Sequence, residues 1–185
     1  MKHFKFSLLA AVLLLASSCD RFSKHSSPEE LLQKAAQSPN MDAGAGKFSI
    51  DRPSGWQKID TLLNGIHVTL LLGSPGSSSF RPNMSVVTES MHGLSVDSYF
   101  DQSIATLGQY LQNFSAGQKG EKDINGNHAK WMQYTHHQNG FDIDVLVYVI
   151  PKDGIAYLIT CSAPKGQLGQ SQAEFDSAVA SFRIS

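Results

Sequence analysis

Three closely spaced turn signals constrain the fold of this chain more than any other feature of its sequence. Asn-Gly dipeptides stand at 125–126 and 139–140, and Pro-Lys-Asp-Gly stands at 151–154. Asn-Gly favours the two-residue turn of a β-hairpin, because both of its residues tolerate positive φ. Strand-like runs lie on either side of each signal, so the sequence predicts an antiparallel meander over residues 117–163.

The patterns outside the meander predict two helices and further strands. Strands are expected at 48–50, 67–72 and 83–88, and helices at 96–111 and 172–182. Ser95 is placed to cap the first helix, and Ser171 with Glu174 has the spacing of a capping box for the second. The expected fold class is α+β, with helices packed on a mainly antiparallel sheet.

The second hairpin of the meander carries the best-defined polar group. With a two-residue turn at 139–140, His137 lies opposite Asp142. Thr135 then lies opposite Asp144, and all four side chains point to one face of the sheet. His137, Asp142 and Asp144 are a candidate site for a divalent metal, for which no fourth ligand is identified. The favoured alternative is a cross-strand charge pair at a solvated end of the sheet, so no metal and no other cofactor is predicted.

Two aromatic residues are expected on that same face. Trp131 and Tyr148 are predicted cross-strand neighbours, and cover by a helix is the favoured explanation for both. The alternative is an aromatic patch that binds a partner protein, on the face that bears Trp131, Tyr148, His137 and Asp142. The opposite face of the hairpin is expected to be core and carries Met132, Tyr134, His136, Ile143, Val145 and Val147.

The N-terminus has the pattern of an export leader that ends at a cysteine. Two lysines precede an apolar run at 6–16, which is long enough for a signal-peptide core and too short to span a bilayer. The small residues before Cys19 resemble a bacterial lipobox, so residues 1–18 are predicted to be a lipoprotein signal peptide and Cys19 to carry the lipid. The predicted location is the bacterial cell envelope, anchored to a membrane and facing the periplasm. Asp20 favours the inner membrane if enteric-type sorting applies.

Composition divides the remaining chain into a tether and one domain. Residues 19–46 are rich in Ser, Pro, Asn, Gly and Ala and are predicted to be a flexible tether with one short helix. Residues 47–185 are expected to form a single domain. With Cys19 used for lipid, Cys161 has no disulfide partner and is expected to be a small buried side chain.

Charge and motifs argue against several function classes. The formal net charge is −1 and the basic residues are scattered, which gives no basic face for nucleic acid. The Gly- and Ser-rich stretch at 73–79 lacks the Gly-Lys-Ser or Gly-Lys-Thr of a phosphate loop, so no nucleotide is predicted. The chain has no Gly-x-Ser-x-Gly motif. We therefore expect no enzyme, and a hydrolase or a metal-dependent enzyme is the less favoured alternative.

Four segments resemble the PsbP/DcrB-like group, whose fold is shared with the Mog-type Ran-binding proteins. These segments are 48–56, 126–129, 154–160 and 181–183. The resemblance implies an α/β/α sandwich over the whole domain and no family active site. It also implies a binding or assembly module, so the expected function is that of a non-catalytic protein-binding or scaffolding lipoprotein. Its expected partners are the membrane, through Cys19, and another envelope protein. A carrier or chaperone that shelters an apolar peptide or lipid is the alternative.

Overall fold

The computed structural model describes residues 47–63, 66–74 and 80–185. The predicted signal peptide, the tether, Cys19 and Asp20 lie outside these ranges. The described part begins where the single domain was expected to begin. Within it, no helix has both the length and the apolar character needed to cross a membrane.

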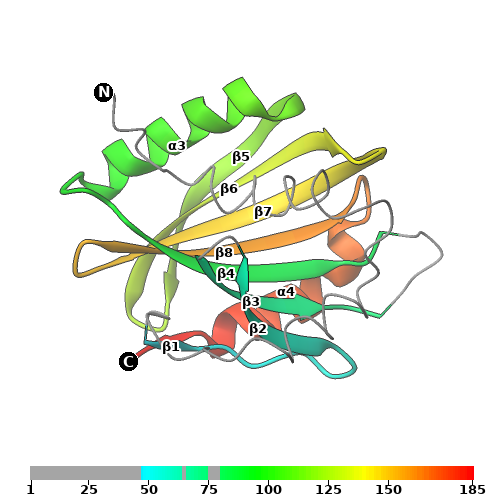
Figure 1. The fold of residues 1–185 in the computed structure, drawn as a ribbon, viewed down its shortest axis with the longest axis horizontal. Helices are drawn as coiled ribbons and strands as arrows, with labels where there is room; N and C mark the ends of the chain where they lie inside the picture. The colour runs from blue at the N-terminus through cyan, green and yellow to red at the C-terminus, as the bar shows by residue number, and fades with distance from the viewer. Residues whose placement is uncertain (1–46, 64–65, 75–79) are drawn as a thin grey trace.

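A seven-stranded antiparallel sheet forms the body of the domain (Figure 1). Its strand order is β2-β3-β4-β8-β7-β6-β5. The strands are β2 (Gln57–Leu63), β3 (Ile66–Leu72), β4 (Asn83–Ser90), β5 (Gln112–Ile124), β6 (Asn127–Gln138), β7 (Phe141–Lys152) and β8 (Ile155–Pro164). The α+β class predicted from the sequence is confirmed.

The meander has the turns and the register predicted from the sequence. Asn125, Asn139 and Asp153 all have φ between 51° and 53°, and the glycine after each also has positive φ. The turn at 139–140 pairs His137 with Asp142, and further along the hairpin Trp131 pairs with Tyr148. Local turn chemistry therefore determines which side chains share each face of this hairpin.

The edge strand β2 is a strand that the sequence patterns do not predict. Its sequence lacks a clear alternation of apolar and polar residues, and Ile59 is buried between exposed neighbours. Full backbone pairing with β3, from Gln57 opposite Leu72 to Leu63 opposite Ile66, holds the segment extended. The strand thus depends on pairing with its neighbour more than on its own pattern.

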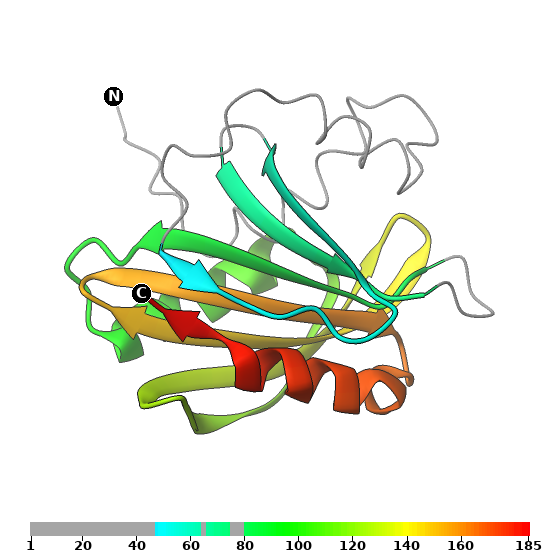
Figure 2. The same ribbon diagram turned by 90° about the horizontal axis from the view of Figure 1, so that it is seen from below.

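Two helices lie on opposite faces of the sheet, α3 (Val96–Tyr110) and α4 (Gln172–Ser181). On one face Tyr99, Phe100 and Leu107 of α3 pack with apolar side chains of β6, β7 and β8. α4 lies on the other face (Figure 2). Its Phe175 and Val179 belong to a second apolar cluster. The layers are therefore helix, sheet and helix, as the sandwich predicted from the resemblance requires.

The two helices begin in different ways. The Ser95 side chain accepts a hydrogen bond from the Ser98 amide at 3.2 Å, which confirms the predicted cap of α3. The capping box predicted for α4 is wrong, because Ser171 stands at the N-cap without a side-chain hydrogen bond. A 3₁₀ turn, η1 (Leu168–Ser171), leads directly into α4, so Ser171 has φ −104° and ψ 11° in place of the extended backbone of a usual cap.

A short second sheet joins the two ends of the described domain. β1 (Phe48–Ser49) pairs with β9 (Arg183–Ile184), with Phe48 opposite Ile184. The Phe48 and Phe182 rings lie 5.6 Å apart, and Phe182 is fully buried in the α4 cluster. The chain therefore enters and leaves the domain at one place.

Candidate functional site

The aromatic pair on the predicted partner-binding face is largely covered. Tyr148 is 4 % exposed and lies in the apolar cluster of α4, so helix cover is the explanation that applies to it. Trp131 is partly buried against the same cluster. An added Cβ at Gly120 would meet the Trp131 ring at 3.0 Å, so the ring lies flat against β5. Tyr148 offers no side-chain surface to a partner, and contact through Trp131 stays a prediction.

Two of the polar residues of that face, His137 and Asp142, form a pair. His137 Nδ1 lies 2.8 Å from Asp142 Oδ1, and this hydrogen bond is the main reason that the pKa of Asp142 is lowered. Asp144 is used elsewhere, because its Oδ2 accepts a hydrogen bond from the Gly166 amide at 2.7 Å. Among the described residues, no group of three His, Cys, Asp or Glu side chains could hold a metal ion.

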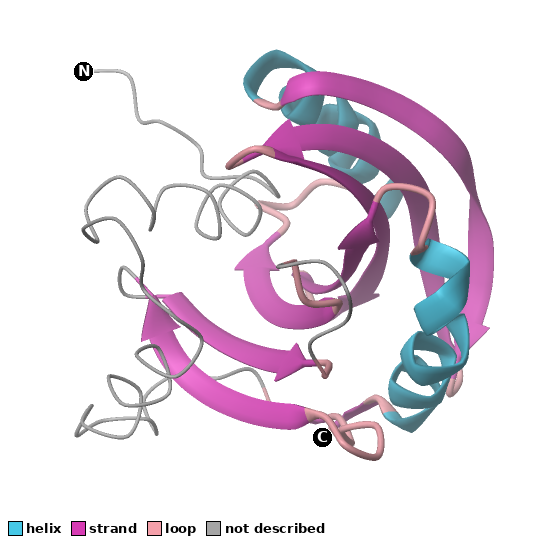
Figure 3. Cartoon of the chain, turned by 90° about the vertical axis from the view of Figure 1, so that its right-hand side faces the viewer, coloured by secondary structure: helices cyan, strands magenta, loops and turns pink. Residues whose placement is uncertain are grey.

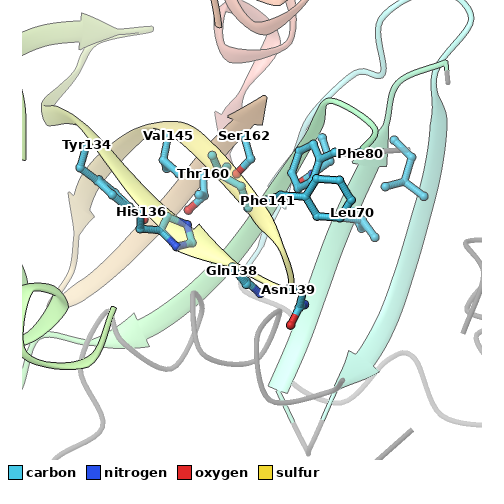
Figure 4. A pocket seen from close by; sticks show the side chains of 13 residues that line it. Leu70, Phe80, Tyr134, His136, Gln138, Asn139, Phe141, Val145, Thr160 and Ser162 are labelled. Carbon is cyan, nitrogen blue, oxygen red and sulfur yellow. The ribbon is translucent and has the colours of Figure 1, made fainter. Parts of the chain in front are cut away.

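A pocket of about 260 Å³ lies on the opposite face of the same hairpin, where the sequence predicted core. Its walls come from β3, β6, β7 and β8, with Asn83 at the start of β4 and Phe80 in the segment that precedes β4. The lining residues are Leu70, Leu72, Phe80, Asn83, Tyr134, His136, Gln138, Asn139, Phe141, Ile143, Val145, Thr160 and Ser162. In Figure 4, Tyr134 and His136 stand on one side, and Phe80 and Leu70 stand on the other.

The curvature of the sheet makes this face concave. β3 and β6 are separated by β4, β8 and β7 in the sheet, yet side chains of both line one pocket. The Phe80 and Phe141 rings lie 5.7 Å apart and join the two sides at one end. Figure 3 shows the curl of the strands that brings these elements toward one another.

The pocket exists because α3 covers only part of the concave face. Ala156 and Leu158 of β8 pack in the α3 cluster, whereas Thr160 and Ser162, further along the same face, line the pocket. No residue of α3 lines the pocket. In Figures 1 and 3 the helix lies beside β5 and β6 and away from β2 and β3. The helix therefore leaves the part of the concave face near β3 uncovered.

Two buried polar atoms in the pocket wall have no partner among the described residues. They are the Tyr134 hydroxyl and His136 Nδ1, on side chains whose residues are 2 % and 4 % exposed. The two rings are neighbours, with centroids 5.8 Å apart. Buried polar groups in folded proteins nearly always have a hydrogen-bond partner, so each of these unpartnered atoms needs an explanation.

Burial disfavours the charged form of both of these groups. Burial raises the pKa of Tyr134. Burial also lowers the pKa of His136, and a hydrogen bond with the backbone of His137 opposes this change more weakly. Among the described residues, no Lys, Arg, Asp or Glu lines the pocket. The site therefore combines apolar walls with hydrogen-bonding groups and no formal charge, a combination typical of small-ligand sites.

The pocket was not predicted from the sequence, although two features of the sequence indicate it. His136 follows Met132 and Tyr134 on one face of β6, and Thr160 and Ser162 follow Leu158 on the same face of the sheet in β8. Polar side chains at such positions indicate a face that is not sealed by apolar packing. The expectation for Cys161 is confirmed: the side chain is fully buried, and burial raises the pKa of its thiol.

Comparison with solved structures shows which known proteins have a similar fold. No family model and no curated protein matches the chain. LpqN of Mycobacterium tuberculosis, described as involved in cell envelope biogenesis, has a TM-score of 0.60 at 11 % identity and covers 78 % of this chain and 86 % of its own. Protein PA94 of Pseudomonas aeruginosa, of unknown function, has a TM-score of 0.57 at 13 % identity and covers 73 % and 95 %. Cyanobacterial PsbP of Synechocystis sp. PCC 6803 has a TM-score of 0.51 at 14 % identity and covers 81 % and 99 %.

At identities this low the likeness shows the fold alone. The chain has a PsbP-like fold, as the sequence resemblance implied. None of the three proteins is described as an enzyme.

Proposed function

We propose that this chain is a membrane-anchored envelope protein whose domain binds an apolar group in the concave pocket without catalysis. The observation that carries the proposal is the pocket itself, a space of about 260 Å³ with largely apolar walls on a face that α3 leaves uncovered. A scaffold needs only surface contacts, whereas a carrier needs a core that is left incomplete. The pocket therefore favours the carrier function over the scaffold.

The envelope location rests on the N-terminal sequence. The leader pattern and Cys19 support export and lipid anchoring. The likeness of the fold to LpqN, a protein of envelope biogenesis, is consistent with this location. The test is metabolic labelling with palmitate, in which the native protein takes up label and sediments with membranes while the Cys19→Ser variant does neither. A native protein that takes up no label would remove the anchor from the proposal.

The arrangement of hydroxyl groups in the pocket supports a binding role over a catalytic one. Thr160 and Ser162 lie on β8, and His136 lies on β6, with β7 between them. Two strand spacings of about 4.8 Å put roughly 10 Å between the backbones of these strands. His136 Nδ1 has no hydrogen-bond partner among the described residues, whereas the base of an activated nucleophile is hydrogen-bonded to it. The described pocket residues therefore give no support to a catalytic role through His136 Nδ1.

The proposed binding is testable with toluene, a small apolar probe, on the mature chain carrying Cys19→Ser. We expect toluene to shift the NMR methyl signals of Ile143 and Val145, which line the pocket. Ser162→Leu should abolish these shifts, because it adds apolar volume to the pocket wall. Thr135→Leu is the matched control, since Thr135 lies on the opposite face of the hairpin. Shifts that are absent, or that survive Ser162→Leu, would refute the proposed function.

A further inference from the structure

The buried side-chain polar atoms that lack a hydrogen-bond partner among the described residues all lie on the concave face of the sheet. They are Glu89 Oε1, the hydroxyls of Tyr99 and Tyr134, and His136 Nδ1. Tyr99 and Tyr134 belong to the α3 cluster, and Glu89 on β4 lies between two members of that cluster. His136 follows Tyr134 on the same face of β6. The unmet hydrogen bonds are therefore gathered under and beside α3, and none of them belongs to the α4 cluster.

These atoms stay without a partner for as long as α3 covers the face. Each of them has almost no accessible surface, so neither water nor a ligand in the pocket reaches it. A buried polar group without a partner destabilises the conformation that buries it. Lifting α3 admits water to the atoms beneath it and removes that penalty. The closed position of α3 is therefore less stable than its apolar contacts alone would make it.

The other attachments of α3 to the sheet are weak. Four of its fifteen residues are buried, namely Tyr99, Phe100, Ser103 and Leu107. Asp97 and Asp101 make ion pairs with lysines of β6 and β5 respectively, and both aspartate side chains are exposed. Exposed ion pairs contribute little to stability. The helix is thus held mainly by three large side chains, on the same face as the unmet polar atoms.

The other helix, α4, is attached to its face of the sheet by hydrogen bonds as well as by apolar contacts. Asn125, in the turn between β5 and β6, donates hydrogen bonds to the carbonyls of Ala180 and Phe182 at 2.9 and 2.8 Å. The Ser181 hydroxyl accepts a hydrogen bond from the Asp51 amide at 2.8 Å. We therefore use α4 as the reference for a helix that stays in place.

The backbone at both ends of α3 is suited to a hinge. Before the helix, His92 and Gly93 have φ of 52° and 77°. After it, Asn113 has φ of 53°, and the pairing of β5 with β6 is irregular between Gln112 and Ser115. Hinges of moving segments are usually a few residues in loops or at the ends of elements. These positions allow α3 to move as one body between β4 and β5.

The surface beneath α3 continues the wall of the pocket. Tyr134, Ile143 and Val145 belong both to the pocket wall and to the α3 cluster. The next residues on the same face, Val147 of β7 and Leu158 of β8, lie in the cluster only. Lifting α3 therefore joins the pocket and the surface beneath the helix into one longer, largely apolar trough.

We propose that α3 is a lid, which lifts from the concave face on its two hinges and opens the space beneath it to an apolar ligand larger than the closed pocket. The open state offers this ligand the apolar floor of β7 and β8, with the hydrogen-bonding groups of Tyr134 and His136 at its side. The inference rests on the proposed function for the nature of the site. The motion itself is measurable without a ligand.

Native-state hydrogen exchange on the mature Cys19→Ser chain measures the motion, because an amide exchanges when the segment that protects it opens. We expect the amides of Ile104 and Leu107 in α3 to be at least about tenfold less protected than the amide of Val179 in α4. Tyr99→Phe should raise the protection of the α3 amides about fivefold, because it removes an unmet hydroxyl from the closed state. Tyr157→Phe in the α4 cluster is the matched control and should leave the protection of α3 unchanged.

The uncharged probe N-phenyl-1-naphthylamine, which fluoresces in apolar sites, measures the access that the lid gives. An apolar cavity of about 150 Å³ accepts benzene, so a pocket of about 260 Å³ is too small for a probe with a naphthalene and a phenyl ring. We expect the probe to bind the Cys19→Ser chain, and Tyr99→Phe to weaken this binding about fivefold, because the apparent affinity scales with the open fraction. Toluene, which fits the closed pocket, should bind both chains equally.

The outcomes separate the lid from the proposed function. Protection of Ile104 and Leu107 that equals that of Val179, or that Tyr99→Phe leaves unchanged, would overturn the lid. A probe that does not bind, or that binds both chains with equal affinity, would overturn it as well, because the space beneath α3 would then not belong to the site. Absence of toluene binding would count against the proposed function alone, since the exchange results do not depend on toluene.

Discussion

Glu89 is expected to make the stability of the domain fall as pH rises. It lies on β4 between Val87 and Met91, two residues of the α3 cluster that share its face. Its Oε1 is buried, and within the described residues it has neither a hydrogen-bond partner nor an ion pair. Burial raises the pKa of Glu89 from 4.5 to about 8. The neutral carboxyl is thus the form that the folded state favours.

The sign and the size follow from proton linkage. A pKa raised in the folded state contributes stability that is fully present below the unfolded value of 4.5 and is lost as pH rises through about 8. A shift from 4.5 to about 8 is about 3.5 units, or at most about 5 kcal/mol at 1.36 kcal/mol per unit. The residue Glu89 is only partly buried, so solvent screens part of the charge of its carboxylate. We therefore expect a smaller loss, about 2 kcal/mol, between about pH 5 and about pH 9.

Glu89→Gln removes the titration and keeps the shape of the side chain. Urea unfolding of the native protein and the variant at a series of pH values gives the difference in their free energies of unfolding. We expect the variant to gain about 2 kcal/mol relative to the native protein over that pH range. Glu121→Gln is the control, because the pKa of exposed Glu121 is lowered by its hydrogen bond with Lys130, so its difference should stay flat above about pH 5. A flat difference for Glu89→Gln would refute the reasoning.

Three further predictions concern packing, a turn and an exposed pair. Phe175→Ala should cost about 3–5 kcal/mol in urea unfolding, because Phe175 is fully buried in the α4 cluster, and a cost below about 1 kcal/mol would contradict the packing described. Gly140→Ala should cost about 1–2 kcal/mol through backbone strain alone, since its φ is 82° and an added Cβ meets nothing within 4 Å, and a neutral result would contradict this. Asp142→Asn should lower the thermal midpoint near about pH 6, and this effect should shrink as pH falls below the ordinary value of 3.8, because the lowered pKa of Asp142 gives stability that is lost as the carboxylate is protonated; an effect of unchanged size in strong acid would exclude the pair with His137 as its cause.

The sequence by itself determined the central meander, its register and the two helices. Asn-Gly turns at 125–126 and 139–140 fix which residues face one another, so the pairs His137–Asp142 and Trp131–Tyr148 could be predicted without a structure. The apolar spacing of 96–111 likewise predicted α3. These features depend on local backbone preferences and on periodicity, which a single sequence contains.

The tertiary structure decided what each face of the sheet meets. The face that bears Tyr148 is covered by α4, and the face that bears His136, expected to be sealed core, holds the pocket. Both outcomes depend on how far the sheet curls and on where α3 ends over it. These are properties of elements distant in the chain, and no local pattern contains them. The same reason explains why β2, which is held by its pairing with β3, was absent from the sequence prediction.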